Sequence, residues 1–556
     1  MPSVTSEAHT RLIQQIKHME RVRSPWWSIW RDVSDYFLPR RYPWLLTDKE
    51  WKSASIRNTK LLDSTSVLAL RTLSSGMMNG VTSPARPWFR LRIAGFEDEE
   101  VPHAVRIWLD EAGQRMMLVM SESNFYNALG VLYLEWACFG TASMGIYPDF
   151  EEVIRCYNYA LGEFYIDTDY RGLVNRHARE FQRTVEQCVD EFGLENCSIQ
   201  VQTDYRAGGV RRMNPVKIFH LIEPNDLSDG LAVRPDALAR EVYWQADGPK
   251  GRVLALRPLD EMPNISPRWD VYANDVYGTS PCMDALADAI QLQHMTRRTA
   301  QGLDKMVSPP LLVNKMLANR PKSMQPDGVT YVNGQDLGAG AAPVYQIQIP
   351  FQELQLQKQE LQQRIQRTLH NDLFRMISEL DTVRSATEID ARREEKLVLL
   401  GPVLERFESE GLGPCIERIF RICERAGVFP PPPAELAQTE IQIQYVSVLS
   451  DAQRAVSTAP IERFLQVIAG MAQLFPQELE VINPEEILRD YAESIGVKAK
   501  LLRSREEFAE RLAAAQEQQA AAQAAEMGGA LAQGAQQLSQ TDVGGGQNAL
   551  QAVLGG

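Results

Sequence analysis

The sequence of 556 residues has little positive charge and no long hydrophobic run. It carries 58 lysine and arginine residues against 72 aspartate and glutamate residues, which gives a formal net charge of −14. Proteins that grip DNA usually present a basic face to its phosphates, so this balance argues against tight DNA binding but not against contact with DNA that slides past. No apolar run approaches the roughly 18 residues of a membrane-spanning helix. The first residues also lack the apolar region of a secretory signal peptide, and we expect neither feature.

The motifs of common enzymes are absent as well. The chain has no GxxxxGK[ST], GxSxG, HExxH or GxGxxG. Its seven cysteines form no CxxC pair and have no histidine at metal spacing, so we expect reduced thiols and no structural zinc. Asp167 and Asp169 form a DxD pair that could hold a divalent cation, although this spacing is common by chance. We predict no catalytic residues, no metal and no cofactor.

Helical patterns flank a region of mixed pattern. Residues 1–123 are predicted to form helices and a strand, with a first helix capped by Thr5 or Ser6. Residues 124–147 are predicted to form a helix that is apolar nearly all round, as in helices buried on more than one side. Residues 148–275 are predicted to form an α+β insert. Its β-like runs cover 151–170, 216–224, 240–246 and 269–275, and its helical interval covers 174–193.

A long helix with a marked beginning and end is predicted within residues 276–310. Ser280 is the expected N-cap, and Pro281 is expected at the first helical position, where its missing N–H costs nothing. The charged side chains that complement its two ends are Asp284 and Asp288 at the start and Arg297, Arg298 and Lys305 towards the end. The expected packing face comprises Met283, Leu286, Ile290, Leu303 and Met306. The charge gradient therefore has a local explanation and does not require contact with DNA.

The remainder is expected to be mostly helical. Residues 311–350 have a strand-and-loop pattern with a glycine-rich stretch, whereas 351–433 and 434–515 have helical patterns. Residues 516–556 are rich in Ala, Gln and Gly, and we expect them to be disordered or partly helical. The basic stretch 205–217 is either a solvated hairpin tip or a functional patch. The predicted fold class is therefore α+β and predominantly α-helical.

Three segments resemble the portal (head-to-tail connector) proteins of short-tailed bacteriophages. The N-terminal signature of that family is similar to "LLDSTSVLALRTLSSGMMNGVTSPARPWFRL" (61–91). Its central helix is similar to "YGTSPCMDALADAIQLQHMTRRTAQGLDKMVSPPLLV" (277–313), and its C-terminal signature to "SATEIDARREEKLVLLGPVLERFESEGLGPCIERIF" (385–420). The segments occur in the family's order, and the resemblance extends over about residues 5–500.

The resemblance implies a multidomain portal fold with a wing, a stem, a clip and a crown, assembled as a dodecameric ring. On that basis we expect an N-terminal wing part (1–123), a stem helix (124–147), an α+β clip (148–275), a second stem helix (276–310), a β/loop segment with a candidate tunnel loop (311–350), wing helices (351–433), a helical crown (434–515) and a variable tail (516–556).

The implied function is that of a structural virion protein at one capsid vertex, assembled in the host cytoplasm, whose channel passes double-stranded DNA during packaging and ejection. The implied partners are further copies of the chain, the large terminase subunit, the major capsid and scaffolding proteins, and head-tail adaptor or tail proteins, with no membrane. Candidate channel residues are Arg297, Arg298, Lys305, Lys315, Arg320 and Lys322, for which salt bridges between subunits are the alternative. Candidate clip residues for contact with the motor are Arg206, Arg211 and Arg212. The competing functions are another ring-forming head-tail adaptor or tail component, and a metal-dependent DNA-processing enzyme that uses the DxD pair.

Overall fold

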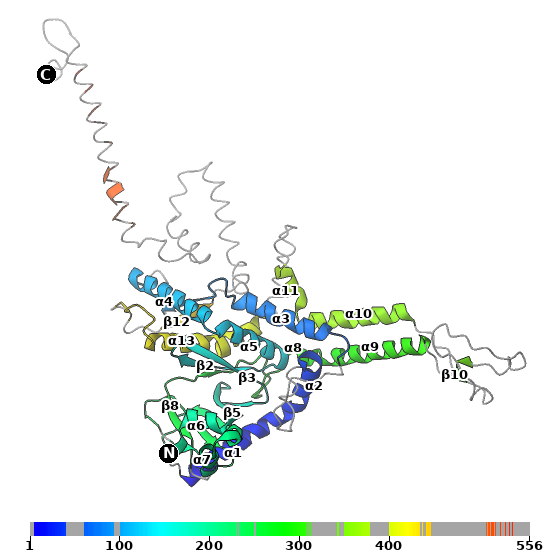
Figure 1. The fold of residues 1–556 in the computed structure, drawn as a ribbon. Helices are drawn as coiled ribbons and strands as arrows, with labels where there is room; N and C mark the ends of the chain where they lie inside the picture. The colour runs from blue at the N-terminus through cyan, green and yellow to red at the C-terminus, as the bar shows by residue number, and fades with distance from the viewer. Residues whose placement is uncertain are drawn as a thin grey trace, which may run out of the picture. The chain divides into compact units, whose positions relative to one another are not determined.

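Figure 1 shows the computed structural model of the chain. It describes residues 5–39, 61–93, 101–228, 233–248, 252–307, 350–378, 400–433 and 441–445, together with short pieces elsewhere. The chain divides into two compact units, of which the first comprises Met1–Arg90, Gly113–Pro430 and Ile443–Pro460 and the second Leu91–Ala112, Pro431–Gln442 and Ile461–Gly556. The described residues form helices and antiparallel sheets, so the fold class is α+β.

Helices open the first unit: α1 (Ser6–Arg23), η1 (Ser24–Trp26), α2 (Trp27–Phe37), α3 (Thr65–Val81) and α5 (Phe125–Phe139). Thr5 caps α1 as predicted, because its side chain accepts a hydrogen bond from Ala8 N at 3.3 Å. The apolar stripe of α1, formed by Leu12, Ile16 and Met19, is buried in one core with residues of the large sheet. Helix α1 is therefore held by the apolar face that its sequence pattern predicted.

Helix α5 is shorter than predicted. The helix expected over 124–147 ends at Phe139, because Gly140 adopts a left-handed backbone conformation with φ of 75°. Residues Ser143–Asp149 form strand β2 instead. The buried side chains of α5 include Phe125, Leu129 and Trp136, so its apolar character reflects burial in the monomer.

An α+β insert follows α5. Its strands are β2, β3 (Val153–Tyr159), β4 (Phe164–Thr168), β5 (Val174–Thr184), β6 (Pro215–Pro224), β7 (Ala239–Gln245), β8 (Ala255–Leu259) and β9 (Asn264–Ile265). Five of them form an antiparallel sheet in the order β4-β5-β6-β7-β8, and three form a sheet in the order β3-β2-β9. The β-like runs at 151–170, 216–224 and 240–246 are confirmed as strand-forming.

Two local predictions within the insert are wrong. The first half of the predicted helical interval 174–193 is strand β5, which pairs with β4 on one side and β6 on the other, so cross-strand pairing overrides its local pattern. The run 269–275 is not a strand but a turn, closed by a hydrogen bond from Asp275 N to Tyr272 O, and only Asp270 forms a β-bridge, to Thr279.

Short helices pack on the large sheet: α6 (Val185–Phe192), η3 (Leu194–Asn196), α7 (Ile199–Ala207) and η4 (Gly209–Met213). We call them the helical cap. Their apolar side chains, including Cys188 and Val201, share a core with Ile218 and Tyr243 of the sheet. The basic stretch 205–217 is consequently the end of α7, η4 and the start of β6, rather than the tip of a hairpin.

The chain returns to the helices through α8 (Pro281–Asp284) and α9 (Leu286–Val307), so the predicted single helix is interrupted at Ala285. Helix α9 lies alongside α10 (Phe351–Thr368), as Figure 1 shows, and an ion pair between Arg364 and Asp288 at 2.8 Å joins the two. The predicted packing face is wrong in part. Leu303 and Met306 are 48% and 40% exposed, whereas the buried residues of α9 are Ala289, Leu292 and Gln293.

The remaining described elements of the first unit are α11 (Asn371–Ser378), helical residues 400–407, a π-helical turn (Glu408–Leu412), and α13 (Gly413–Arg425). Helix α4 (His103–Glu122) and the paired strands β1 (Phe89–Ile93) and β12 (Ile441–Tyr445) lie partly in the second unit. The predictions for 311–350, 434–515 and 516–556 fall almost entirely outside the described residues, apart from short pieces such as β10 (Leu311–Leu312) and β11 (Ala342–Pro343). Among described residues, none of the helices is both long and apolar enough to cross a membrane.

Candidate functional site

The insert is joined to the helices at a crossing of two chain segments, residues 138–143 on the way out and 264–281 on the way back. Gly140 and Gly278 lie against each other there, and a Cβ atom on either would collide with the carbonyl oxygen of the other. The two segments are joined by hydrogen bonds from Trp269 N to Gly140 O at 2.8 Å and from Gly278 N to Thr141 Oγ1 at 2.9 Å. Only glycine fits at both positions, so the crossing depends on these two residues.

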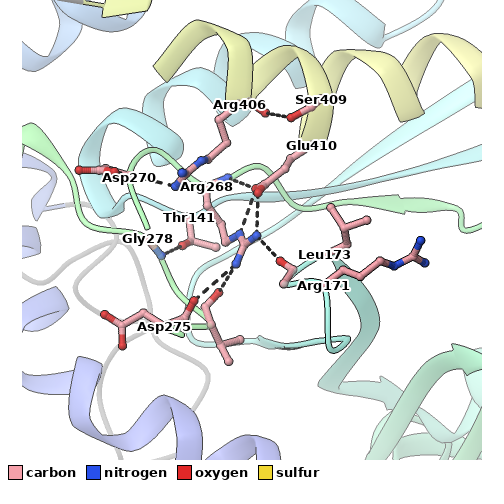
Figure 2. Close-up of polar contacts among 12 residues, drawn as sticks. Thr141, Arg171, Leu173, Arg268, Asp270, Asp275, Gly278, Arg406, Ser409 and Glu410 are labelled. Carbon is pink, nitrogen blue, oxygen red and sulfur yellow. Dashed lines mark hydrogen bonds and ion pairs between the residues drawn. The ribbon is translucent and has the colours of Figure 1, made fainter. Parts of the chain in front are cut away.

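Arg268 is the centre of the crossing, as Figure 2 shows. Its Nε and Nη2 donate to the two carboxylate oxygens of Glu410 at 3.0 and 2.6 Å, and its backbone N–H also donates to Glu410, at 3.1 Å. Nη2 further donates to Gly172 O at 2.6 Å, and Nη1 to the carbonyls of Asp275 and Val276 at 3.5 and 3.4 Å. The Arg268 side chain is 4% exposed and that of Glu410 11%. One guanidinium thus ties together the insert, the returning segment and the π-helical turn that carries Glu410.

The start of α8 fixes the returning segment to the helices. Ser280 accepts a hydrogen bond from Met283 N at 3.2 Å, which confirms it as the N-cap, and its hydroxyl donates to Cys138 O at 2.7 Å. Pro281 is the first helical residue, as predicted. Tyr277 is fully buried against Trp30, with ring centroids 5.1 Å apart, and its hydroxyl accepts a hydrogen bond from the backbone of β4 at 3.2 Å. Burial raises the pKa of Tyr277, so the phenol stays neutral.

A second polar junction holds α9 against α3 and α10. The amide oxygen of Gln293 accepts from the backbone N–H groups of Leu62 and Asp63 at 2.6 and 2.8 Å, and its NH2 group donates to Asp63 O at 2.8 Å. The Asp63 carboxylate accepts from Gln362 at 2.9 Å and lies 3.2 Å from the Lys358 ammonium. Burial opposes the charge on Asp63, but the hydrogen bonds outweigh it and lower the pKa of this carboxyl. The buried polar residue on α9 is therefore an anchor between helices.

Ser143, His177 and Asn264 are arranged like the nucleophile, base and orienting residue of a hydrolase. Ser143 Oγ lies 3.0 Å from His177 Nε2, and Asn264 Nδ2 lies 2.8 Å from His177 Nδ1. The imidazole is contacted through both of its ring nitrogens, which fixes the orientation of the ring between Ser143 and Asn264. Ser143 and His177 are each 1% exposed. Burial lowers the pKa of His177 well below its usual range, and the arrangement serves to join β2, β5 and β9.

A second buried histidine lies within the large sheet. Arg179 Nε donates to His220 Nδ1 at 3.3 Å, and His220 Nε2 lies 3.3 Å from a carboxylate oxygen of Glu241. The Tyr243 ring stacks on the imidazole with centroids 4.0 Å apart. Burial outweighs the hydrogen bond to Glu241 and lowers the pKa of His220 to about 4. His220 is therefore neutral at physiological pH.

The predicted site residues lie in three places. Arg297, Arg298 and Lys305 are exposed on the distal half of α9, whereas Lys315, Arg320 and Lys322 lie outside the described residues. Arg206 and Arg211 are exposed on the helical cap. Arg212 instead serves the cap itself: its Nε donates to Tyr205 O at 3.1 Å, and its guanidinium lies 4.3 Å from the Tyr205 ring centroid.

The DxD residues both have protein partners. Asp167 pairs with Arg176 at 3.6 Å, and Asp169 accepts hydrogen bonds from the backbone N–H groups of Arg171 and Leu173 at 2.8 and 2.9 Å. Among described residues, no group of three or more His, Cys, Asp or Glu side chains could hold a metal ion. In this structure Asp169 closes the loop after β4.

Sequence reasoning missed the residues that organise the crossing. Arg268 and Glu410 are 142 positions apart, and neither belongs to a local motif. Gly140 offered the best available signal, since a glycine after an apolar helix is a common C-cap. No local sequence pattern indicates the contact between Gly140 and Gly278. The pattern around Gln293 is that of an ordinary helix, so it does not indicate the role of this residue.

Comparisons with known proteins bear on this architecture. A family described as "Bacteriophage head to tail connecting protein" matches residues 9–502. A probable portal protein of Bordetella phage BPP-1 is 35% identical over 517 residues, which cover 92% of this chain and 92% of that protein. The portal protein of Salmonella phage epsilon15 is 35% identical over 538 residues, which cover 96% of this chain and 95% of that protein. The family resemblance of the three segments is thereby confirmed, and the chain belongs to the bacteriophage head to tail connecting protein family.

Proposed function

We propose that this chain is a portal protein, copies of which form a closed ring that passes double-stranded DNA into and out of a phage capsid. The observation that carries the proposal is the family match over residues 9–502, together with two relatives named as portal proteins. The twelve-fold copy number, the position at one capsid vertex and the assembly in the host cytoplasm are part of this proposal, and the family relationship supports them. We also propose contacts with the large terminase subunit, the capsid and scaffolding proteins, and the tail.

The architecture supports different roles for the helices and for the insert of each subunit. Helices α5, α8 and α9 would form the stem, and the insert from β2 to β9 with its helical cap would form the clip. Helix α9 has 22 residues and spans roughly 33 Å at 1.5 Å per residue. The crossing would then be the joint between stem and clip, and its dense hydrogen bonding would keep both at a fixed angle in every subunit.

A ring of identical subunits needs head-to-tail contacts between two different surfaces of the chain. The distal part of α9 offers apolar side chains for one of them, since Leu303 and Met306 are substantially exposed and Val307 is 72% exposed. We assign this end of α9 to contact with a neighbouring subunit. The contact would bury side chains that the monomer leaves in water.

The exposed basic residues of α9 are the candidates for the channel wall. A channel must not hold DNA through many phosphate contacts, because such contacts bind with a salt-dependent affinity that opposes sliding. We expect the double variant Arg297→Gln, Arg298→Gln to change the rate or extent of DNA packaging. A matched control is Lys17→Gln, Arg21→Gln, which removes two exposed charges from α1. If both variants package DNA as the wild type does, Arg297 and Arg298 do not line the channel wall.

The tunnel-loop assignment of Lys315, Arg320 and Lys322 has its own test. If particles with Arg320→Ala and Lys322→Ala package full-length genomes at the normal rate, these residues have no role in DNA movement.

For the motor contact, Arg206→Glu and Arg211→Glu should weaken binding of the large terminase subunit. Arg212 is excluded from that test because it holds the helical cap together.

The proposed function as a whole is tested genetically. A stop codon in this gene should give capsids without DNA and without tails, and expression of the chain from a plasmid should restore infectious particles. Full capsids in the absence of the chain would contradict a portal function.

A further inference from the structure

Cys188 and Cys197 contact each other in the core of the helical cap. Their sulfur atoms are 3.7 Å apart, and both residues are 0% exposed. All seven cysteines of the chain are free thiols in this structure. The two residues are nine positions apart, on α6 and directly after η3. A disulfide between them would close a short loop that joins α6 to α7.

The surroundings hold both sulfur atoms in place. Asn196 Nδ2 donates to Phe192 O at 2.8 Å, and Gln202 Nε2 donates to Cys197 O at 3.0 Å, so the turn before α7 is fixed on both sides of Cys197. The thiol of Cys197 is 3.3 Å from Gly193 O, a carbonyl it can donate to while reduced. The sulfur atoms are in contact at 3.7 Å, and closing the gap to the roughly 2 Å of an S–S bond requires rotation about the Cα–Cβ bonds of the two residues.

We propose that Cys188 and Cys197 are a thiol–disulfide pair, which a peroxide oxidises to an intrachain disulfide across the helical cap. One thiolate attacks a peroxide oxygen, the O–O bond breaks, and a sulfenic acid forms as hydroxide leaves and takes up a proton. The second thiolate then attacks the sulfenic sulfur, so that the S–S bond forms and the S–O bond breaks, with the second oxygen leaving as water. Two thiols and one hydrogen peroxide thus give one disulfide and two waters.

The disulfide would stabilise the part of the insert that carries Arg206 and Arg211. A cross-link restricts the unfolded and locally opened chain more than the folded one. In the reduced protein the turn between α6 and α7 is held by hydrogen bonds and packing alone, without a covalent link. The inference does not depend on the proposed function, since it concerns chemistry within one chain.

The test uses the purified full-length protein treated with hydrogen peroxide. Remaining thiols are blocked with N-ethylmaleimide in denaturant, the protein is reduced, and newly exposed thiols are labelled with an isotopically heavy maleimide before peptide mass mapping. We expect the heavy label on Cys188 and Cys197, and a linked peptide that is two hydrogen atoms lighter before reduction. Cys423, buried in α13, is the internal control and should retain the light label.

Two variants sharpen the test. Cys197→Ser should leave Cys188 without the heavy label, whereas Cys423→Ser should leave the pair's oxidation unchanged. Oxidised wild-type protein should also resist proteolysis between α6 and α7 for several-fold longer than reduced protein. The inference is overturned if Cys188 and Cys197 stay reduced, become sulfinic acids, or cross-link to another cysteine or another chain.

Discussion

Arg268 carries a buried positive charge. Its counterion is the carboxylate of Glu410, which is 142 positions away in the sequence but in direct contact in the structure. Burying an ion pair costs several kcal/mol of desolvation per ion, so the pair with Glu410 adds little net stability, but removing one partner leaves the other charge uncompensated. Arg268 also donates to three backbone carbonyls, which fixes the guanidinium in one orientation. The pair therefore specifies the geometry of the crossing more than it stabilises the fold.

Glu410→Ala should destabilise the protein by about 3–5 kcal/mol, because Arg268 stays buried without its counterion. Chemical unfolding followed by circular dichroism measures the change. The matched control is Arg234→Gln, which breaks the ion pair between Arg234 and Asp260. The side chains of these two residues are 49% and 52% exposed. That change should cost less than about 1 kcal/mol. Equal losses in the two variants would show that Arg268 does not depend on Glu410.

Acid should destabilise the large sheet through its two buried histidines, His177 and His220. An unfolded chain protonates a histidine near pH 6.5, whereas His220 in the folded protein protonates only near pH 4. The unfolded state binds more protons between these values, so stability falls as the pH falls through this window, and His220 alone contributes roughly 3 kcal/mol to this loss.

His220→Gln should reduce this pH dependence between pH 6.5 and 4, since glutamine takes up no proton, and should leave the part that the buried His177 contributes. Hydrogen exchange of the backbone amides in strands β5 to β7, compared at pH 7 and pH 5, measures this change in stability. The control variant is His18→Gln, which removes an exposed histidine from α1 and leaves the large sheet unchanged. A wild-type pH dependence in the His220 variant would contradict the assigned cause.

At the scale of elements, the crossing depends on two glycines in van der Waals contact. Gly140→Ala places a methyl group against the Gly278 carbonyl and forces alanine into a left-handed conformation. We expect a loss of more than about 2 kcal/mol, measured by thermal unfolding. The control is Gly113→Ala within α4, where no atom other than the adjacent backbone of the same helix lies within 4 Å of the added methyl group. Alanine there should be neutral or stabilising by up to about 1 kcal/mol, and a similar loss in both variants would refute the close-approach argument.

Elements with local signals could be predicted from the sequence, and those defined by distant partners could not. Thr5, Ser280 and Pro281 were predicted because caps and first-turn prolines act within a few residues. Strand β5 was mistaken for helix because its pairing partners β4 and β6 decide its conformation. The exposed faces of α9 were misjudged because a single sequence does not show which face meets α10. The contacts of Arg268 lie beyond any local pattern.

At the scale of the whole molecule, the family could be predicted from three segments and is confirmed over residues 9–502. The assignments of stem, clip, wing and crown stay predictions, as do the channel and motor residues. They share one physical requirement. Each depends on a neighbouring subunit or partner that the single chain does not supply, and the exposed apolar end of α9 is where the chain most clearly requires one.

The central claim is that copies of this chain close into a ring. The most direct measurement is electron microscopy of the purified protein, combined with its mass in solution by light scattering. The account predicts rings with a central hole and a mass near twelve times the 62.8 kDa of the single chain. A stable particle of 62.8 kDa with no ring in the images would contradict it.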